Sequence, residues 1–175
     1  MVIKINDIPP EGLTLQFEQG LDLFDTGTAD TGIKAVLSIK QSGGGNLHIN
    51  GRVQSKPQLE CSRCLKSFSF EIDTAIDIDL SPVSAMGTAT EHELSGGELD
   101  VEFYQGDEID PLAFIKEQLL ISVPMVPLHS QDCKGLCAAC GTDLNSNTCE
   151  CRNEKGDDFG AFSVLKDLFK NKKEQ

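Results

Sequence analysis

The spacing of the cysteines constrains this chain more than any other feature of its sequence. The 175 residues include seven cysteines, two of them at Cys61 and Cys64 and five in the segment 133–151. A Cys-x-x-Cys pair occurs in each group, in "ECSRCLKSF" and in "LCAACG", and this spacing lets both thiolates face one metal ion. Where thiols stay reduced, clustered cysteines indicate metal binding before disulfides. The sequence therefore predicts a fold that depends on bound metal.

The N-terminal region and the hydropathy pattern indicate where such a chain works. The stretch "MVIKINDIPPEGLTL" lacks the apolar block and small-residue cleavage site of a secretory signal. No apolar run approaches the roughly 20 residues that a membrane helix needs. We therefore expect a cytoplasmic protein that has no membrane partner.

The cysteines can be divided into two complete ligand sets. The second Cys-x-x-Cys pair can meet the pair at Cys149 and Cys151 across a short loop, and together they supply four thiolates for a tetrahedral ion. Cys133 then remains, and His129 precedes it by four residues. Both can join the upstream pair. The predicted zinc sites are site 1 (Cys61, Cys64, His129 and Cys133) and site 2 (Cys137, Cys140, Cys149 and Cys151).

An alternative assignment of the cysteines gives one zinc site only. It would use Cys133, Cys137, Cys140 and one of the last two cysteines, and it would leave Cys61 and Cys64 as ordinary thiols. Cys-x-Cys is a less usual ligand pair, so either Cys149 or Cys151 could be a bystander. The spacing thus predicts at least one zinc ion, and the full count predicts two. A catalytic zinc keeps an open position, whereas these sets close at four ligands. We therefore expect structural zinc, no enzymatic activity and no small-molecule substrate.

The first two thirds of the chain show the period-two alternation of β-strands. Apolar residues alternate over 33–39, resume over 47–53 after the turn "SGGG", and then fall on even positions from Phe68 to Leu80. Shorter runs of this kind occur at 13–17 and 99–103, and the stretch 81–98 has no period and is predicted to be a loop. These patterns predict an antiparallel sheet that could close into a barrel.

One helix is predicted in the core, over residues 110–122. Asp110 is a good N-cap, Pro111 suits the first helical position and Pro124 should end the helix. The predicted fold class is α+β, with a zinc-stapled C-terminal segment packed on the sheet. We expect one structural domain: a β-rich core with the helix (1–128), a zinc segment (129–151), and a linker with a short C-terminal helix (152–175).

The charge of the chain is unevenly distributed. The net charge is −13, and residues 67–115 carry twelve acidic side chains and no lysine or arginine. An acidic total argues against non-specific phosphate binding, which requires a basic surface. A local basic concentration nevertheless surrounds the first Cys-x-x-Cys pair. The predicted RNA contacts are Arg52, Lys56, Arg63 and Lys66. The competing interpretation is a solvated strand edge whose charged side chains prevent pairing with another chain.

Four stretches give the chain a family resemblance. They are "LECSRCLKSF", "IDPLAFIKEQLLISVPMVPLH", "DCKGLCAACGTDLN" and "FSVLKDLF", which cover roughly the C-terminal two thirds in order. In these stretches the chain resembles the YceD family, the large-ribosomal-RNA-accumulation proteins of bacteria and plastids. The resemblance implies a factor required for accumulation of 23S ribosomal RNA. Its implied partners are ribosomal RNA, an RNA precursor or a large-subunit assembly intermediate. Some relatives lack the later cysteine cluster, which fits two separable sites.

Two functions of other classes stay open from the sequence. Cys61 and Cys64 could cycle between metal-bound and disulfide forms as a zinc-sensitive redox pair. Alternatively, the acidic run from Glu91 to Asp110 could bind a basic partner, such as a ribosomal protein, and make the chain a protein adaptor.

Overall fold

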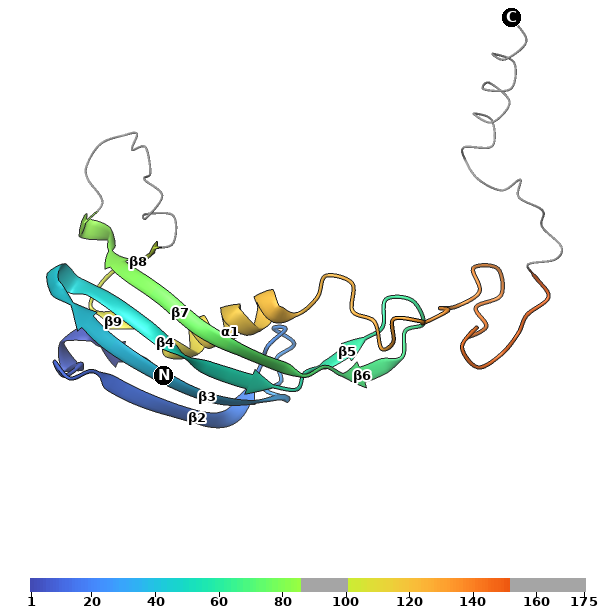
Figure 1. Ribbon diagram of the computed structural model, residues 1–175, viewed down its shortest axis with the longest axis horizontal. Coiled ribbons are helices and arrows are strands. Elements are labelled where there is room, and N and C mark those ends of the chain that lie inside the picture. Colours follow the sequence, from blue (N-terminus) through green and yellow to red (C-terminus); the bar gives the residue numbers. More distant parts are fainter. Residues whose placement is uncertain (86–100, 152–175) are drawn as a thin grey trace, which may run out of the picture. The chain divides into compact units, whose positions relative to one another are not determined.

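The computed structural model describes residues 1–85 and 101–151 as a mixed α+β protein that forms two compact units (Figure 1). The sheet unit consists of Met1–Leu59 and Phe68–Pro127. The cysteine unit consists of Glu60–Ser67 and Leu128–Gln175, of which the second segment is described as far as residue 151. All seven cysteines and His129 belong to the cysteine unit. Both predicted zinc sites are therefore contained in one unit.

The elements follow one another in an order that places the helix last. Among the described residues they are β1 (Ile3–Lys4), η1 (Ile5–Asp7), β2 (Leu13–Leu21), β3 (Thr31–Ser42), η2 (Gly43–Gly45), β4 (Asn46–Ser55), β5 (Gln58–Glu60), β6 (Ser67–Ser69), β7 (Ile72–Pro82), η3 (Val83–Ala85), β8 (Val101–Tyr104), β9 (Glu108–Ile109) and α1 (Pro111–Ser122).

A five-stranded sheet in the order β2-β3-β4-β7-β8 is the main element of the sheet unit. The first four strands pair antiparallel, and β8 pairs parallel with β7. The glycine turn between β3 and β4 confirms the predicted hairpin, because Gly44 and Gly45 have φ angles of 79° and 85°. Glycine adopts such angles at little steric cost.

The hydrophobic core lies between one face of this sheet and α1. The alternation along β3, β4 and β7 buries or half-buries one side chain in two, and the register places Ile49 between Ile39 and Ile78 on the neighbouring strands. From the helix, Ile115 and Leu119 are fully buried against this face. Figure 1 shows α1 running along the sheet beside β4 and β7.

The helix confirms its predicted signals and packs one face against the core. The Asp110 carboxylate accepts a hydrogen bond from the Leu112 N–H at 3.1 Å, Pro111 occupies the first turn, and the helix ends at Ser122. Leu120 is 39% exposed, and Phe114 is buried. Pro111, Ile115 and Leu119 form an i, i+4 row against the core, and Phe114 lies beside that row.

Three predictions about the sheet are corrected. Among the described residues there is no closed barrel, because β2 and β8 are the edges of an open sheet. The strand predicted to run through 68–80 is broken between β6 and β7, where the Phe70 N–H donates to the Pro57 carbonyl at 3.0 Å. The segment predicted as a loop from 81 begins with the end of β7 and with η3. Its remainder, like the predicted C-terminal helix, lies outside the described residues.

The packing of the zinc segment on the sheet stays a prediction. Among the described residues, no helix has the length and apolar character needed to cross a membrane.

The close approach of β3 and β4 gives a test of the sheet. A Cβ at Gly51 would collide with the Val36 carbonyl oxygen and would lie 2.8 Å from Leu37 Cδ2. Gly51→Ala should therefore lower the free energy of unfolding by about 1–3 kcal/mol, as overpacking does. Urea denaturation followed by circular dichroism measures this. Gly32→Ala in β3 is the matched control, because nothing lies within 4 Å of its Cβ position. Equal stability of the two variants would contradict the described approach of the strands.

Candidate metal centres

The two Cys-x-x-Cys segments form knuckles with the same backbone hydrogen bonds. In the first, the Cys61 N–H donates to the Lys66 carbonyl at 3.0 Å and the Leu65 N–H donates to the Cys61 carbonyl at 2.9 Å. In the second, the Cys137 N–H donates to the Thr142 carbonyl and the Gly141 N–H to the Cys137 carbonyl, both at 2.8 Å. The chain therefore builds the same turn twice, and each turn presents two thiols to one side.

The fourth residue after the first cysteine of each knuckle has a left-handed conformation. Its φ is 59° at Leu65 and 72° at Gly141. Glycine adopts this conformation readily, whereas an L-residue with a Cβ incurs a steric cost of about 1–2 kcal/mol. The first knuckle is thus held in a strained turn that the second knuckle avoids.

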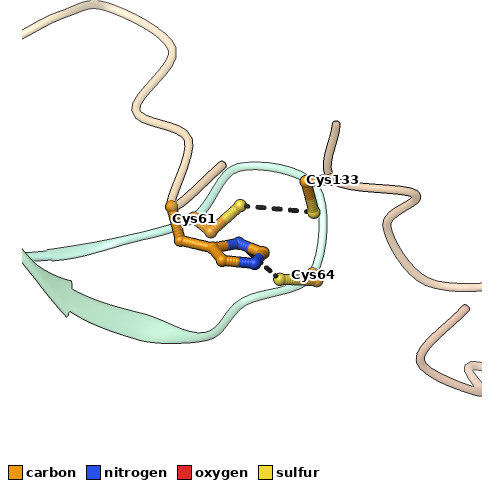
Figure 2. A group of neighbouring side chains, drawn as sticks. Cys61, Cys64 and Cys133 are labelled. Carbon is orange, nitrogen blue, oxygen red and sulfur yellow. Dashed lines mark hydrogen bonds between the residues drawn. The ribbon is translucent and has the colours of Figure 1, made fainter. Parts of the chain in front are cut away.

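Site 1 brings together the four residues that the sequence predicts for it. Figure 2 shows the sulfurs of Cys61, Cys64 and Cys133 converging from the knuckle and from the later segment. The Cys61 and Cys133 sulfurs are 3.8 Å apart, and Cys64 Sγ lies 3.4 Å from His129 Nδ1. All four ligand atoms lie within 4.8 Å of one another. A tetrahedral zinc with Zn–S bonds of about 2.3 Å places its sulfurs about 3.8 Å apart, so this set fits the ion.

Site 2 gathers the other four cysteines within one loop. The sulfurs of Cys137, Cys140, Cys149 and Cys151 also lie within 4.8 Å of one another. Cys140 is exposed and its three partners are half-buried, whereas in site 1 Cys61 and Cys133 are buried. All seven thiols are free. The two sets therefore share a geometry that suits a metal ion and differ in their exposure to solvent.

The thiols of each set have divergent pKa values. Burial alone would raise the pKa of Cys61, but hydrogen bonds from His129 and from nearby backbone N–H groups lower that pKa to about 5. Burial, together with the neighbouring sulfurs, raises the pKa of Cys64 to about 11. In site 2, hydrogen bonds from Thr142 lower the pKa of Cys140 to about 6. Each set thus contains a thiolate near neutral pH, and a metal ion would displace protons from the remaining thiols.

Arg63 holds the later segment of site 1 to the knuckle. Its guanidinium Nη1 donates to the carbonyls of Cys133 at 2.9 Å and Gln131 at 3.2 Å, and its own carbonyl accepts from the Leu136 N–H at 3.0 Å. The RNA contact predicted for Arg63 stays a prediction, and the structure shows that its guanidinium also holds the segment of a ligand. The sequence gives no local signal for this role, since Gln131 and Cys133 lie 68 and 70 residues away.

Asn145 is a second residue that the sequence does not reveal. Its side-chain Nδ2 donates to Cys133 Sγ at 3.5 Å, and its Oδ1 accepts from the Lys134 N–H at 2.8 Å. An amide that donates to a ligand sulfur stabilises the thiolate and orients it. Asn145 stands within the site 2 loop, where an asparagine otherwise looks like an ordinary turn residue.

The other three predicted RNA contacts differ in their surroundings. The Arg52 guanidinium pairs with the Asp73 carboxylate at 2.5 and 3.0 Å, and the Lys56 ammonium pairs with Glu71 at 2.6 Å. These partners keep the pKa values of Asp73 and Glu71 below their usual range. Lys66 is exposed, and only its backbone carbonyl serves the knuckle. A phosphate at Arg52 or Lys56 would have to compete with a carboxylate.

The fold and the site together define an α+β protein with two closed Cys-rich ligand sets. Residues 49–169 match the family described as "Large ribosomal RNA subunit accumulation protein YceD". The match spans more than half of the chain, and the protein therefore belongs to this family.

Relatives in three organisms align with parts of the chain. An uncharacterized protein of Mycobacterium leprae is 31% identical over 55% of this chain and 42% of its own length. The large ribosomal RNA subunit accumulation protein YceD of Haemophilus influenzae is 29% identical over 48% of this chain and 46% of its own. The chloroplastic YCED homolog 1 of Arabidopsis thaliana is 30% identical over 37% of this chain and 21% of its own. The chain thus spans less than half the length of these relatives. No solved structure matches it significantly.

Exchanging the residues at the left-handed positions tests the two knuckles. Leu65→Gly should tighten zinc binding at site 1 by about fivefold to thirtyfold, because it removes a strain of about 1–2 kcal/mol. Leu65 is 57% exposed, so little buried area is lost. Gly141→Leu should weaken site 2 by a similar factor. Chelator competition on the two variants measures both affinities. Weaker binding at site 1 in Leu65→Gly, or tighter binding at site 2 in Gly141→Leu, would contradict the left-handed turns described for these positions.

Proposed function

We propose that this protein is a non-enzymatic factor for accumulation or processing of large-subunit (23S) ribosomal RNA, built around two structural zinc ions. The observation that carries the proposal is the family match over residues 49–169, which includes both ligand sets. The relatives in Haemophilus and Arabidopsis are named for accumulation of the large ribosomal RNA subunit. We assign the same process to this chain, in the cytoplasm, with ribosomal RNA, its precursor or a large-subunit assembly intermediate as partner.

The geometry of the sites supports structural zinc. Each set supplies four protein ligands, which leaves no position for a substrate or an activated water. Cys61 and Cys133 are buried, and a buried thiolate set that closes around an ion is suited to holding chain segments together. Site 1 would link segments that are far apart in the sequence, and site 2 would order the loop that follows.

Thiol redox chemistry at Cys61 and Cys64 is a second candidate function. The low pKa of Cys61, about 5, favours it, because thiolates are the reactive form. Burial opposes it, since the Cys61 side chain has an exposed fraction of 0% and an oxidant could not reach its sulfur in the described conformation. We therefore keep the structural function as the main proposal.

The double variant Cys61→Ser/Cys64→Ser tests the function at two levels. Native mass spectrometry should find two zinc ions per wild-type chain and one in the variant, because the variant keeps only site 2 complete. In cells that lack the natural protein, the wild-type chain should restore the ratio of large to small ribosomal RNA, and the variant should not.

Ser62→Ala is the matched control, because Ser62 is exposed in the same knuckle and is no ligand. This variant should keep both zinc ions and restore the ribosomal RNA. If the wild-type chain and the double variant both bind one zinc ion, Cys61 and Cys64 are not zinc ligands, and the redox function is favoured. An unchanged ribosomal RNA ratio in cells without the protein would refute the proposed function.

Direct contact with RNA can be separated from contact through a protein. If RNA binds near the first knuckle, Lys66→Glu should weaken binding to 23S fragments several-fold and reduce the salt dependence, since one phosphate contact is lost. Filter binding at several salt concentrations measures this. Lys4→Glu makes the same charge change on β1 of the sheet unit and should have little effect. Equal effects would indicate a general charge effect, and no RNA binding at all would favour a basic ribosomal protein as the partner.

A further inference from the structure

A short segment of the cysteine unit makes hydrogen bonds in two directions. Toward the first knuckle, the Leu136 N–H donates to the Arg63 carbonyl at 3.0 Å, and a Cβ added to Gly135 would lie only 3.0 Å from the same oxygen. Toward the site 2 loop, the Gly135 carbonyl accepts from the Leu144 N–H at 2.9 Å. Leu136 and Asp143 also form a β-bridge. The segment 133–136 is thus shared between the two ligand sets.

Asn145 reaches across this segment to a ligand of site 1. Its Nδ2 donates to Cys133 Sγ and its Oδ1 accepts from the Lys134 N–H. The Asp143 carboxylate holds the amide in place by accepting from the Asn145 backbone N–H at 2.9 Å and from its Nδ2 at 2.6 Å. The hydrogen bonds of Asn145 therefore connect the loop closed by site 2 with a sulfur of site 1.

We propose that Asn145 is a positioning residue that couples the two metal sites, so that metal bound at site 2 strengthens metal binding at site 1. This inference rests on the proposed zinc sites and extends them.

The physical argument concerns the cost of ordering the site 2 loop. All residues from 138 to 150 are exposed or half-buried, so the loop has little apolar burial to fix its conformation. An ion held by Cys137, Cys140, Cys149 and Cys151 closes the loop at both ends and supplies that ordering. The Asn145 side chain is then already positioned to donate to Cys133 Sγ. Without that ion, binding at site 1 must itself bear the cost of ordering Asn145.

The coupling must be reciprocal. If an ion at site 2 raises the affinity of site 1 by some factor, an ion at site 1 raises the affinity of site 2 by the same factor. Loss of a group that orients a metal ligand typically weakens metal binding about 10–100-fold. A factor in that range would make the filling of the two sites cooperative if their own affinities are similar.

The experiment measures metal affinity at each site in the full chain. Cobalt(II) bound by three thiolates and one imidazole gives visible absorption bands different from those of cobalt(II) bound by four thiolates. These bands report each site separately, and chelator competition gives the zinc affinities. Three variants are compared with wild type: Asn145→Leu, Cys149→Ser/Cys151→Ser, and all three changes together. Asn147→Leu is the matched control, because it makes the same change two residues away, where a backbone N–H bonds to the Asp143 carbonyl at 3.0 Å.

We expect Asn145→Leu and the double serine variant each to weaken site 1 about tenfold or more, with Asn147→Leu close to wild type. The triple variant should be no weaker at site 1 than the weaker of the other two, because both changes break the same connection. Wild-type affinity at site 1 in the double serine variant would overturn the coupling. Additive losses would overturn Asn145 as its carrier. A wild-type chain that binds no metal would instead overturn the zinc sites themselves, and the coupling with them.

Discussion

The cysteine unit depends on one interaction, the convergence of Cys61, Cys64, His129 and Cys133 on a common point. Within the described residues, the hydrophobic core cluster belongs to the sheet unit, and the buried side chains of hydrophobic type in the cysteine unit are Cys61 and Cys133. Structural zinc in small Cys-rich sites contributes about 10–16 kcal/mol of apparent binding free energy, comparable with the whole net stability of a domain. A metal ion would therefore take the place that a hydrophobic core has elsewhere.

The sequence was informative where the physics is local. Cys-x-x-Cys spacing, the glycine turn between β3 and β4, and the Asp-Pro start of α1 each depend on a few neighbouring residues, and the structure has these features where they were predicted. The division of seven cysteines and one histidine into two sets could also be made by counting ligands. The structure groups the same residues, and whether zinc binds them stays a prediction.

What the sequence did not reveal depends on contacts between distant residues. Nothing near Arg63 in the sequence indicates that its guanidinium binds the carbonyls of Gln131 and Cys133, and the RNA contact predicted from its charge stays a prediction. The parallel pairing of β8 with β7 has the same origin, because an alternating pattern fixes a buried face but not the direction of the neighbouring strand. Leu65 is a third example, since a left-handed leucine is forced by the knuckle and not by any turn-forming preference.

Charge limits how this protein could reach the partners proposed for it. Of the four basic residues around the first knuckle, Arg52 and Lys56 are paired with carboxylates, whereas Arg63 binds neutral carbonyls and Lys66 is exposed. Zinc would leave each site negative, because three or four thiolates outweigh the charge of the ion. With a net charge of −13, long-range electrostatics would attract basic proteins and repel bare RNA. An RNA contact, where it exists, must therefore be local and formed at short range, whereas a basic ribosomal protein would be attracted at long range.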